Sequence, residues 1–189
     1  MISNLILHFQ RQLCFARTGL FPAKKAFYWC ATLCVFISTI ARADDEVNAK
    51  VTAVFDGNTI QVSCFCEESD VRKVSLVGID SPELGQAFGV EARKFLEELI
   101  LGKEVKVQFQ GKDRFGNYLG VVKINGKADP RIELLKSGFA WTSEKNPSDA
   151  LERYRLEAQE KKRGLWKQEN PVPPWTYRRQ QSMLTPKSS

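Results

Sequence analysis

The sequence predicts an α+β fold that is mainly β: a closed barrel of five strands with about three helices packed on it. Five short runs rich in β-branched and aromatic residues are separated by turn-forming Gly, Asn and Asp. One amphipathic run lies between the third and fourth strands, and two more follow the fifth. This order, without an internal repeat, predicts a single domain over residues 47–166.

The five predicted strands cover residues 47–55, 59–65, 71–78, 103–110 and 118–124. The Asp-Gly-Asn sequence at 56–58 joins the first two, because its glycine can adopt a positive φ. In the fourth strand Val105, Val107 and Phe109 alternate with polar residues, which is typical of a half-buried strand.

The three predicted helices cover residues 86–100, 131–137 and 149–162. An apolar stripe at helical spacing predicts the buried face of the first, formed by Phe88, Ala92, Phe95 and Leu99. Asp129 can cap the second helix, with Pro130 at its first position and Gly138 after its end. Ser148 can cap the third, and residues 165–166 are expected to fold back onto the core. Together these elements predict an OB-type Greek-key barrel, an architecture that commonly binds oligonucleotides.

The composition of residues 1–43 predicts an export signal. They contain five basic residues and no acid, and residues 26–40 form an uncharged apolar run. The Ala-Arg-Ala triplet at 41–43 supplies a cleavage site before an acidic stretch. A membrane span needs roughly 20 residues, so the run is short, although an uncleaved anchor is the alternative. We expect cleavage after Ala43, a periplasmic or secreted protein, and no stable membrane association afterwards.

The net charge of +6 comes mostly from this signal, because the rest of the chain has 23 basic and 22 acidic residues. Basic charge then gathers towards the end, where residues 161–189 contain seven Lys or Arg and one acid. Residues 167–189 are therefore expected to be a Pro-containing basic extension. It could contact a polyanion or remain a solvated tail.

The single histidine, His8, lies in the signal, so the mature part has none. This excludes catalysis by a Ser-His-Asp or Cys-His arrangement and most zinc sites. Cys64 and Cys66 are too few for a disulfide scaffold, and they could pair, bond between chains or remain reduced thiols. Chemistry in this chain must use carboxylates, amines, hydroxyls or a metal held by oxygen.

Two acids stand at the end of the third predicted strand. Pro82 has no N–H and ends the strand, so Asp80 and Glu83 flank a tight turn. Paired carboxylates can hold a hard cation or act as a general base. A surface turn with solvated acids is the alternative.

Motifs along most of the chain resemble the staphylococcal nuclease, or thermonuclease, family. The matching segments are 56–59 (DGNT), 78–83 (GIDSPE), 89–92 (GVEA), 113–116 (DRFG), 137–141 (SGFAW), 164–166 (GLW) and 173–179 (PPWTYRR). They occur in the family's order over residues 47–179, and the last two are similar to the end of exported bacterial members. The resemblance implies an OB barrel and a calcium-dependent phosphodiesterase that acts on DNA and RNA.

The resemblance also implies roles for the acidic turn. Asp80 matches a calcium ligand, Ser81 matches the residue whose backbone carbonyl also binds calcium, and Glu83 matches the base that activates water. Asn58 stands where the family has a second calcium aspartate. Since calcium affinity follows the number of charged ligands, we expect only weak Ca²⁺ binding.

The family's two phosphate-binding arginines are replaced. Ser75 and Asn117 stand at their positions, whereas Arg114 and Phe115 match neighbours that line the nucleotide site. Neither serine nor asparagine can give the bidentate, charged contact of an arginine. The sequence therefore predicts a degraded catalytic site.

Three functions follow from these observations. The first is a weak or inactive nuclease relative, expected to be a monomer, that retains nucleic-acid binding. The second is an active calcium-dependent nuclease that uses substitute basic residues, for which Arg72, Lys73 and Arg114 are candidates. The third is an OB module for a protein or an envelope ligand.

Overall fold

The computed structural model describes residues 46–65, 70–145 and 147–184, which belong to one compact unit. The predicted export signal and Cys66 lie outside the described residues, whereas Cys64 is buried in the core. None of the helices within these ranges has the length and apolar character needed to cross a membrane.

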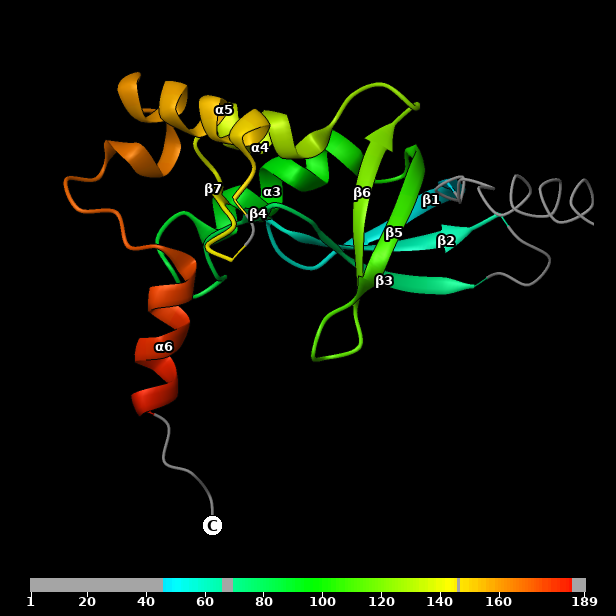
Figure 1. Ribbon diagram of the computed structural model, residues 1–189, viewed down its shortest axis with the longest axis horizontal. Helices are drawn as coiled ribbons and strands as arrows, with labels where there is room; N and C mark the ends of the chain where they lie inside the picture. The colour runs from blue at the N-terminus through cyan, green and yellow to red at the C-terminus, as the bar shows by residue number, and fades with distance from the viewer. Residues whose placement is uncertain (1–45, 66–69, 146, 185–189) are drawn as a thin grey trace, which may run out of the picture. The chain divides into compact units, whose positions relative to one another are not determined.

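Five strands close into a barrel in the order β1-β2-β3-β6-β5, which confirms the predicted fold class (Figure 1). They are β1 (Glu46–Val54), β2 (Thr59–Cys64), β3 (Val71–Leu76), β5 (Glu104–Lys112) and β6 (Tyr118–Ile124). β3 and β6 run parallel, and the other neighbours are antiparallel. The parallel pair needs a long crossover, and that connection contains helix α3 (Gly89–Ile100).

Alternate residues of the strands fill the barrel interior. The fully buried positions include Val51, Ile60, Val62, Val74, Val107 and Val122. Helix α3 adds Leu96 and Ile100 to this cluster. Of the predicted stripe on that helix, Ala92 is fully buried, while Phe95 and Leu99 pack at the edge of the core. The apolar face is therefore real, but it is rotated towards Leu96 and Ile100.

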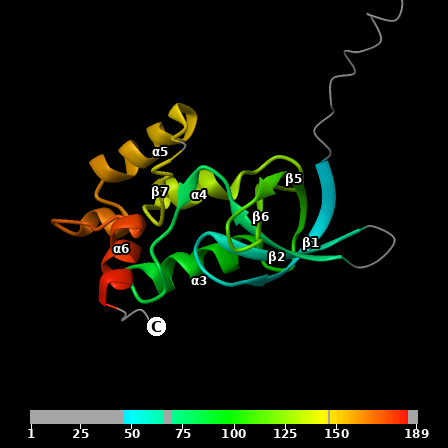
Figure 2. The same ribbon diagram turned by 60° about the horizontal axis from the view of Figure 1, so that its bottom comes forward.

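Within the described residues, four α-helices accompany the barrel, one more than the three predicted. After α3 come α4 (Pro130–Ser137), α5 (Asp149–Glu160), a 3₁₀ helix η1 (Gly164–Lys167) and α6 (Pro174–Leu184). α6 lies in the segment that the sequence predicted to be only an extension. In both ribbon views the helices gather to one side of the barrel (Figures 1 and 2).

The start and end of α4 agree with the prediction. The Asp129 carboxylate accepts a hydrogen bond from the Arg131 backbone N–H at 3.0 Å, and Pro130 occupies the first turn. Gly138 ends the helix with a φ of 72°. A Cβ on Gly138 would overlap the Arg163 carbonyl, so this glycine also permits the close approach of the segment after α5.

The segment after α5 folds back, as the sequence predicted. Leu165 and Trp166 are buried with Ala158 in a second, smaller apolar cluster. The Trp166 ring packs edge-on against Trp141, with 4.4 Å between ring centroids. Phe88 packs on the same cluster, which connects it to the residues before α3.

Two of the predicted boundaries that are wrong lie near the acidic turn. The third strand ends at Leu76, because Gly78 has a φ of 83° and turns the chain into a separate strand, β4 (Ile79–Asp80). Helix α3 begins at Gly89 and not at residue 86, because Phe88 has a left-handed φ of 68°. Residues 81–88 therefore form an extended turn between β4 and α3.

Candidate active site

The two turns that the resemblance assigns to metal binding do lie together. β4 pairs with β7 (Trp141–Thr142) in a small sheet apart from the barrel, and this pairing places Asp80 opposite Trp141. The buried Ser81 hydroxyl donates to the Gly57 carbonyl at 2.9 Å. A Cβ on Gly57 would lie only 2.7 Å from the Ser81 Cβ, so the β1–β2 turn needs glycine here. The acidic turn is thus fixed against the turn that contains Asn58.

Three acids share this region. Burial raises the pKa of Asp80, and the charges of Glu83 and Asp56 raise it further. Burial likewise raises the pKa of Asp56, with an added contribution from Glu83. Sequence reasoning missed Asp56 because it treated residues 56–58 only as a hairpin turn. The available signal was an acid two residues before Asn58 in the same turn.

Asn58 contributes an unpaired oxygen. Its backbone N–H donates to the Asp56 carboxylate at 2.7 Å, and its backbone carbonyl accepts from Leu76. The side-chain Oδ1 is buried and has no hydrogen-bond partner among the described residues. Since buried polar atoms are normally satisfied, this oxygen is a candidate ligand atom, although a neutral one.

Glu83 is held through its backbone. Its carbonyl accepts a hydrogen bond from the Gln86 N–H at 2.8 Å, and its own N–H donates to the Gln86 side chain at 3.3 Å. A Cβ on Gly89 would overlap the Glu83 carbonyl, so α3 begins in direct contact with this residue. The side chain stays 39% exposed and can therefore reach a ligand.

The turn at 113–117 forms a self-contained network. The Asp113 carboxylate accepts hydrogen bonds from the Phe115 N–H at 2.8 Å and from the Asn117 amide Nδ2 at 2.9 Å. Arg114 lies over the Phe115 ring, 4.7 Å from its centroid, and Phe115 is 74% exposed. Within the described ranges, no hydrogen bond or ion pair joins this turn to Asp80 or Glu83.

Ser75, at the other position expected to hold an arginine, lies in the middle of the barrel wall. It pairs with Thr59 of β2 on one side and with Leu119 of β6 on the other. A serine here keeps the strand intact but supplies no positive charge for a phosphate.

The positive charge at the acids comes from a residue that sequence reasoning did not assign to the site. Arg178 of α6 donates through Nη2 to Asp80 at 2.7 Å and through Nη1 to Asp80 at 3.1 Å. Nη1 also donates to Glu83 at 2.8 Å. These ion pairs raise the pKa of Arg178, the bond to Asp80 having the largest effect. The only signal was the Arg-Arg pair at 178–179, which was interpreted as part of a basic tail.

Several further contacts hold α6 beside the acidic turn (Figures 1 and 2). The Tyr177 hydroxyl donates to the Gly85 carbonyl at 3.0 Å, and the Gln86 amide donates to the Val172 carbonyl at 2.6 Å. Arg179 pairs with Glu144 at 2.7 Å. The Trp175 ring packs edge-on against Trp141, with 5.7 Å between centroids. The contacts thus reach both the turn before α3 and the segment around β7.

The oxygen donors suit a hard cation in kind, but the site as folded does not fit one. Asp80 and Glu83 are already neutralised in part by Arg178, and Asn58 offers only a neutral oxygen. Across the described part of the chain, no three acidic, cysteine or histidine side chains group around a common metal position. The Ser81 carbonyl and Asn58 Oδ1 therefore remain predicted ligands.

The other basic residues that the sequence suggested as substitutes for the missing arginines contact groups elsewhere in the protein. The Arg72 guanidinium pairs with Asp70 and lies over the rings of Phe109 and Tyr118, at 4.8 and 4.9 Å from their centroids. Lys73 lies over the Phe55 ring at 4.6 Å. Both belong to the barrel strand β3, and their contacts are not with the acidic turn.

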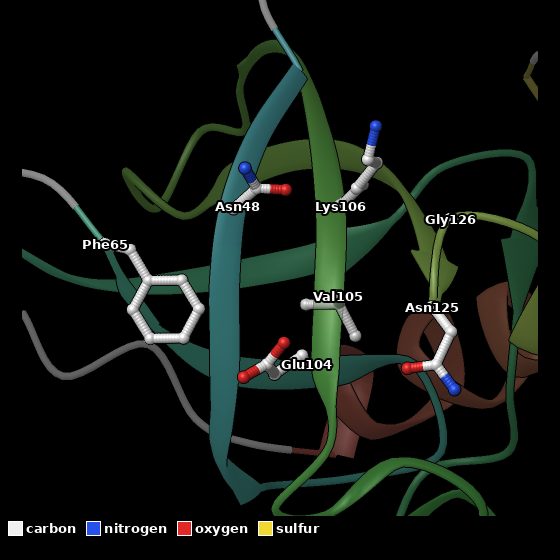
Figure 3. A pocket seen from close by; sticks show the side chains of 7 residues that line it. All are labelled: Asn48, Phe65, Glu104, Val105, Lys106, Asn125 and Gly126. Carbon is white, nitrogen blue, oxygen red and sulfur yellow. The ribbon is translucent and has the colours of Figure 1, made fainter.

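A hollow of about 460 Å³ lies on a different part of the barrel. It is lined by Asn48, Phe65, Glu104, Val105, Lys106, Asn125 and Gly126 (Figure 3). Its lining contains no residue of the acidic turn and none of the predicted site. The chemistry suggested by Asp80 and Glu83 is therefore not located in this hollow.

Comparison with known proteins agrees with this geometry. The family model described as staphylococcal nuclease homologue matches residues 73–168. An uncharacterized endonuclease of Escherichia coli O157:H7 is 34% identical over 134 residues, which cover 70% of this chain and 86% of the relative. An uncharacterized endonuclease of Haemophilus influenzae is 34% identical over 152 residues, covering 80% and 84%. The micrococcal nuclease of Shigella flexneri is 34% identical over 160 residues, covering 79% and 89%.

A closed five-stranded barrel with an acidic turn beside it is consistent with the OB-type fold of the staphylococcal nucleases. The chain belongs to the family of staphylococcal nuclease homologues, which confirms the resemblance found in the sequence.

Proposed function

We propose that this protein is an exported member of the nuclease family that binds nucleic acid and hydrolyses it very slowly or not at all. The observation that carries the proposal is the chemistry at 75 and 117, where the family's arginines are expected. Ser75 is part of the barrel wall, and the Asn117 amide is bound to Asp113. Neither residue offers a cation to a phosphate.

The expected loss of rate is large. One positioned donor to developing negative charge is worth about 2.7–4 kcal/mol of transition-state stabilisation, or roughly 10²–10³ in rate. Two such donors are replaced, and the replacement of an aspartate by Asn58 weakens the affinity for Ca²⁺. Groups that act as one unit are not additive, so the combined loss is not the simple product.

Retained binding is supported by a cluster of basic side chains and partly buried aromatic rings on the barrel. Phe109 and Tyr118 form a ring pair with 5.1 Å between centroids. Arg72 lies over both rings, and Lys112 lies 4.4 Å from the Tyr118 centroid. Aromatic rings beside cations are the usual means by which proteins hold single-stranded nucleic acid.

The active enzyme with substitute basic residues is the second candidate. Arg178 favours it, because this residue does supply a guanidinium at the acids. However, one of its terminal nitrogens donates to Glu83, the expected base, so the guanidinium occupies a carboxylate oxygen that would have to accept the proton of the attacking water. An OB module for a protein or envelope ligand is the third candidate.

Localisation belongs to the same proposal. Cleavage after Ala43 follows from the apolar run and the Ala-Arg-Ala triplet, and it would release a protein beginning at Asp44. N-terminal sequencing of exported protein tests this point. Recovery of the uncleaved chain in a membrane fraction would contradict it.

The function is tested on the protein beginning at Asp44. Labelled single-stranded DNA and RNA are titrated by fluorescence anisotropy, and cleavage is followed with and without Ca²⁺. We expect binding without calcium-dependent turnover, and weaker binding by Lys112→Ala than by the control Lys94→Ala, which removes an exposed lysine from α3. Robust cleavage that is lost in Glu83→Gln would contradict the proposal, and absence of binding would favour the third candidate.

A further inference from the structure

We infer that α6 masks the carboxylates of the acidic turn, and that a hard divalent cation binds Asp80 and Glu83 only when the helix lifts off. Arg178 takes the place of the cation while α6 is docked. This inference concerns access to the carboxylates and not turnover, so it goes beyond the proposed function and does not depend on it.

The geometry of the guanidinium carries the inference. Both terminal nitrogens of Arg178 donate to Asp80, and one of them also donates to Glu83. This is the fork contact that an arginine makes with a carboxylate, extended to a second acid. A cation that uses the same oxygens must displace the guanidinium, because both cannot occupy the space between the two side chains.

The contacts that hold α6 against the acidic turn also keep Arg178 on Asp80 and Glu83. The Tyr177 hydroxyl bonds to Gly85 and the Gln86 side chain bonds to Val172, so α6 and its approach are held by the turn that contains Glu83. Trp175 packs on Trp141, which pairs with Asp80 across the small sheet. If α6 moves as a unit and carries Arg178 away from the acids, only this small set of contacts has to break.

The contacts are strong enough to order the helix and weak enough to release it. Pro174 is the only residue of α6 that is buried, so little apolar surface holds the helix down. The Arg178 side chain is 44% exposed and that of Asp80 is 17% exposed, so water reaches the guanidinium side of the fork and screens the ion pair in part. Segments with few buried apolar contacts open locally at low free energy.

The affinity for a divalent cation should therefore depend on whether Arg178 covers Asp80 and Glu83. Calcium is titrated by calorimetry into the protein beginning at Asp44, into Arg178→Ala and into Arg153→Ala. Arg153 is the matched control, because its removal takes away one positive charge from α5, where it contacts Tyr154. We expect the apparent Kd of Arg178→Ala to fall at least tenfold below that of the unmodified protein, with Arg153→Ala within twofold of it.

Adding Asp80→Asn to Arg178→Ala should remove the gain, which places the bound ion at the acidic turn. Near-UV circular dichroism checks that each variant is folded, and Arg178→Gln replaces Arg178→Ala if the latter is not. Equal affinity of the folded Arg178 variant and the control overturns the inference, as does a gain that survives Asp80→Asn. Since no cleavage is measured, failure here is distinct from failure of the proposed function.

Discussion

Two turns that the nuclease family uses together have different surroundings in this protein. The acidic turn at 80–88 is held by residues distant in sequence, through Ser81 to Gly57 and through Arg178 to both acids. The turn at 113–117 is held by its own Asp113 and Asn117, with Phe115 exposed at its tip. One turn is built into the fold, whereas the other is closed on itself.

The difference separates what the fold preserves from what the chemistry needs. The Gly57, Ser81 and Gly89 contacts keep the acids in place whether or not the protein cleaves anything. The turn at 113–117 stays closed with asparagine at position 117, because the Asn117 amide donates to the Asp113 carboxylate. A family fold with intact acids is therefore no proof of activity, which depends on the particular side chains at the site.

The largest expected effect comes from restoring the two missing arginines together with the missing calcium aspartate. Ser75→Arg, Asn117→Arg and Asn58→Asp combined should raise calcium-dependent cleavage at least about 100-fold, since one positioned donor alone is worth roughly 10²–10³ in rate. Single reversions should do little, because these groups act as one unit. Cleavage of labelled DNA measures the gain.

Glu83→Gln in the restored protein is the matched control, and it should remove the gain. If the unmodified protein already cleaves as fast as the restored one, the comparison of the two turns no longer explains activity. In that case Arg178 would be the first residue to examine as a substitute.

Packing around the two turns predicts the next largest effect. A Cβ at Gly89 would overlap the backbone of Glu83, so Gly89→Ala should lower the free energy of unfolding by about 3 kcal/mol. Gly116 has open space around it but a φ of 84°, so Gly116→Ala should cost only about 1 kcal/mol, as a left-handed non-glycine residue does. Urea unfolding of both variants measures the difference, and equal losses would show that the acidic turn is not the tighter one.

The sequence was sufficient for the barrel and for the acids because local patterns encode both. Alternation predicts the strands, and Pro82 after Asp80 predicts the end of a strand. The break at Gly78 was missed, since the apolar residues continue across it and only a positive φ turns the chain.

The covering of the acids by α6 could not be predicted in the same way. Only Pro174 of this helix is buried, so no apolar stripe marks it in the sequence. Its decisive contact joins Arg178 to acids 95 and 98 positions earlier, and it is made by polar groups alone. Asp56 was missed for a related reason, because only the fold brings it to Asp80 and Glu83.

The smallest expected effect concerns Glu152, which supports the strand pair β4–β7 that carries Asp80. The Glu152 carboxylate accepts hydrogen bonds from the Arg155 Nε at 2.9 Å and from the Thr142 hydroxyl at 2.6 Å, and these bonds lower its pKa. Thr142 belongs to β7, the partner strand of β4. A lowered pKa means that ionised Glu152 stabilises the fold above its unfolded pKa of about 4.3, and that this contribution is lost as the pH falls through the folded value.

Glu152→Gln should therefore lower the free energy of unfolding at pH 7 by about 1 kcal/mol or less, because the pair is partly exposed. At an acid pH below the folded pKa of Glu152, the variant and the parent should differ by much less, since Glu152 is then protonated in both states. Urea unfolding at the two pH values measures the change. A difference that persists in acid would mean that the substitution acts through packing, and that the charge of Glu152 does not support the strand beside Asp80.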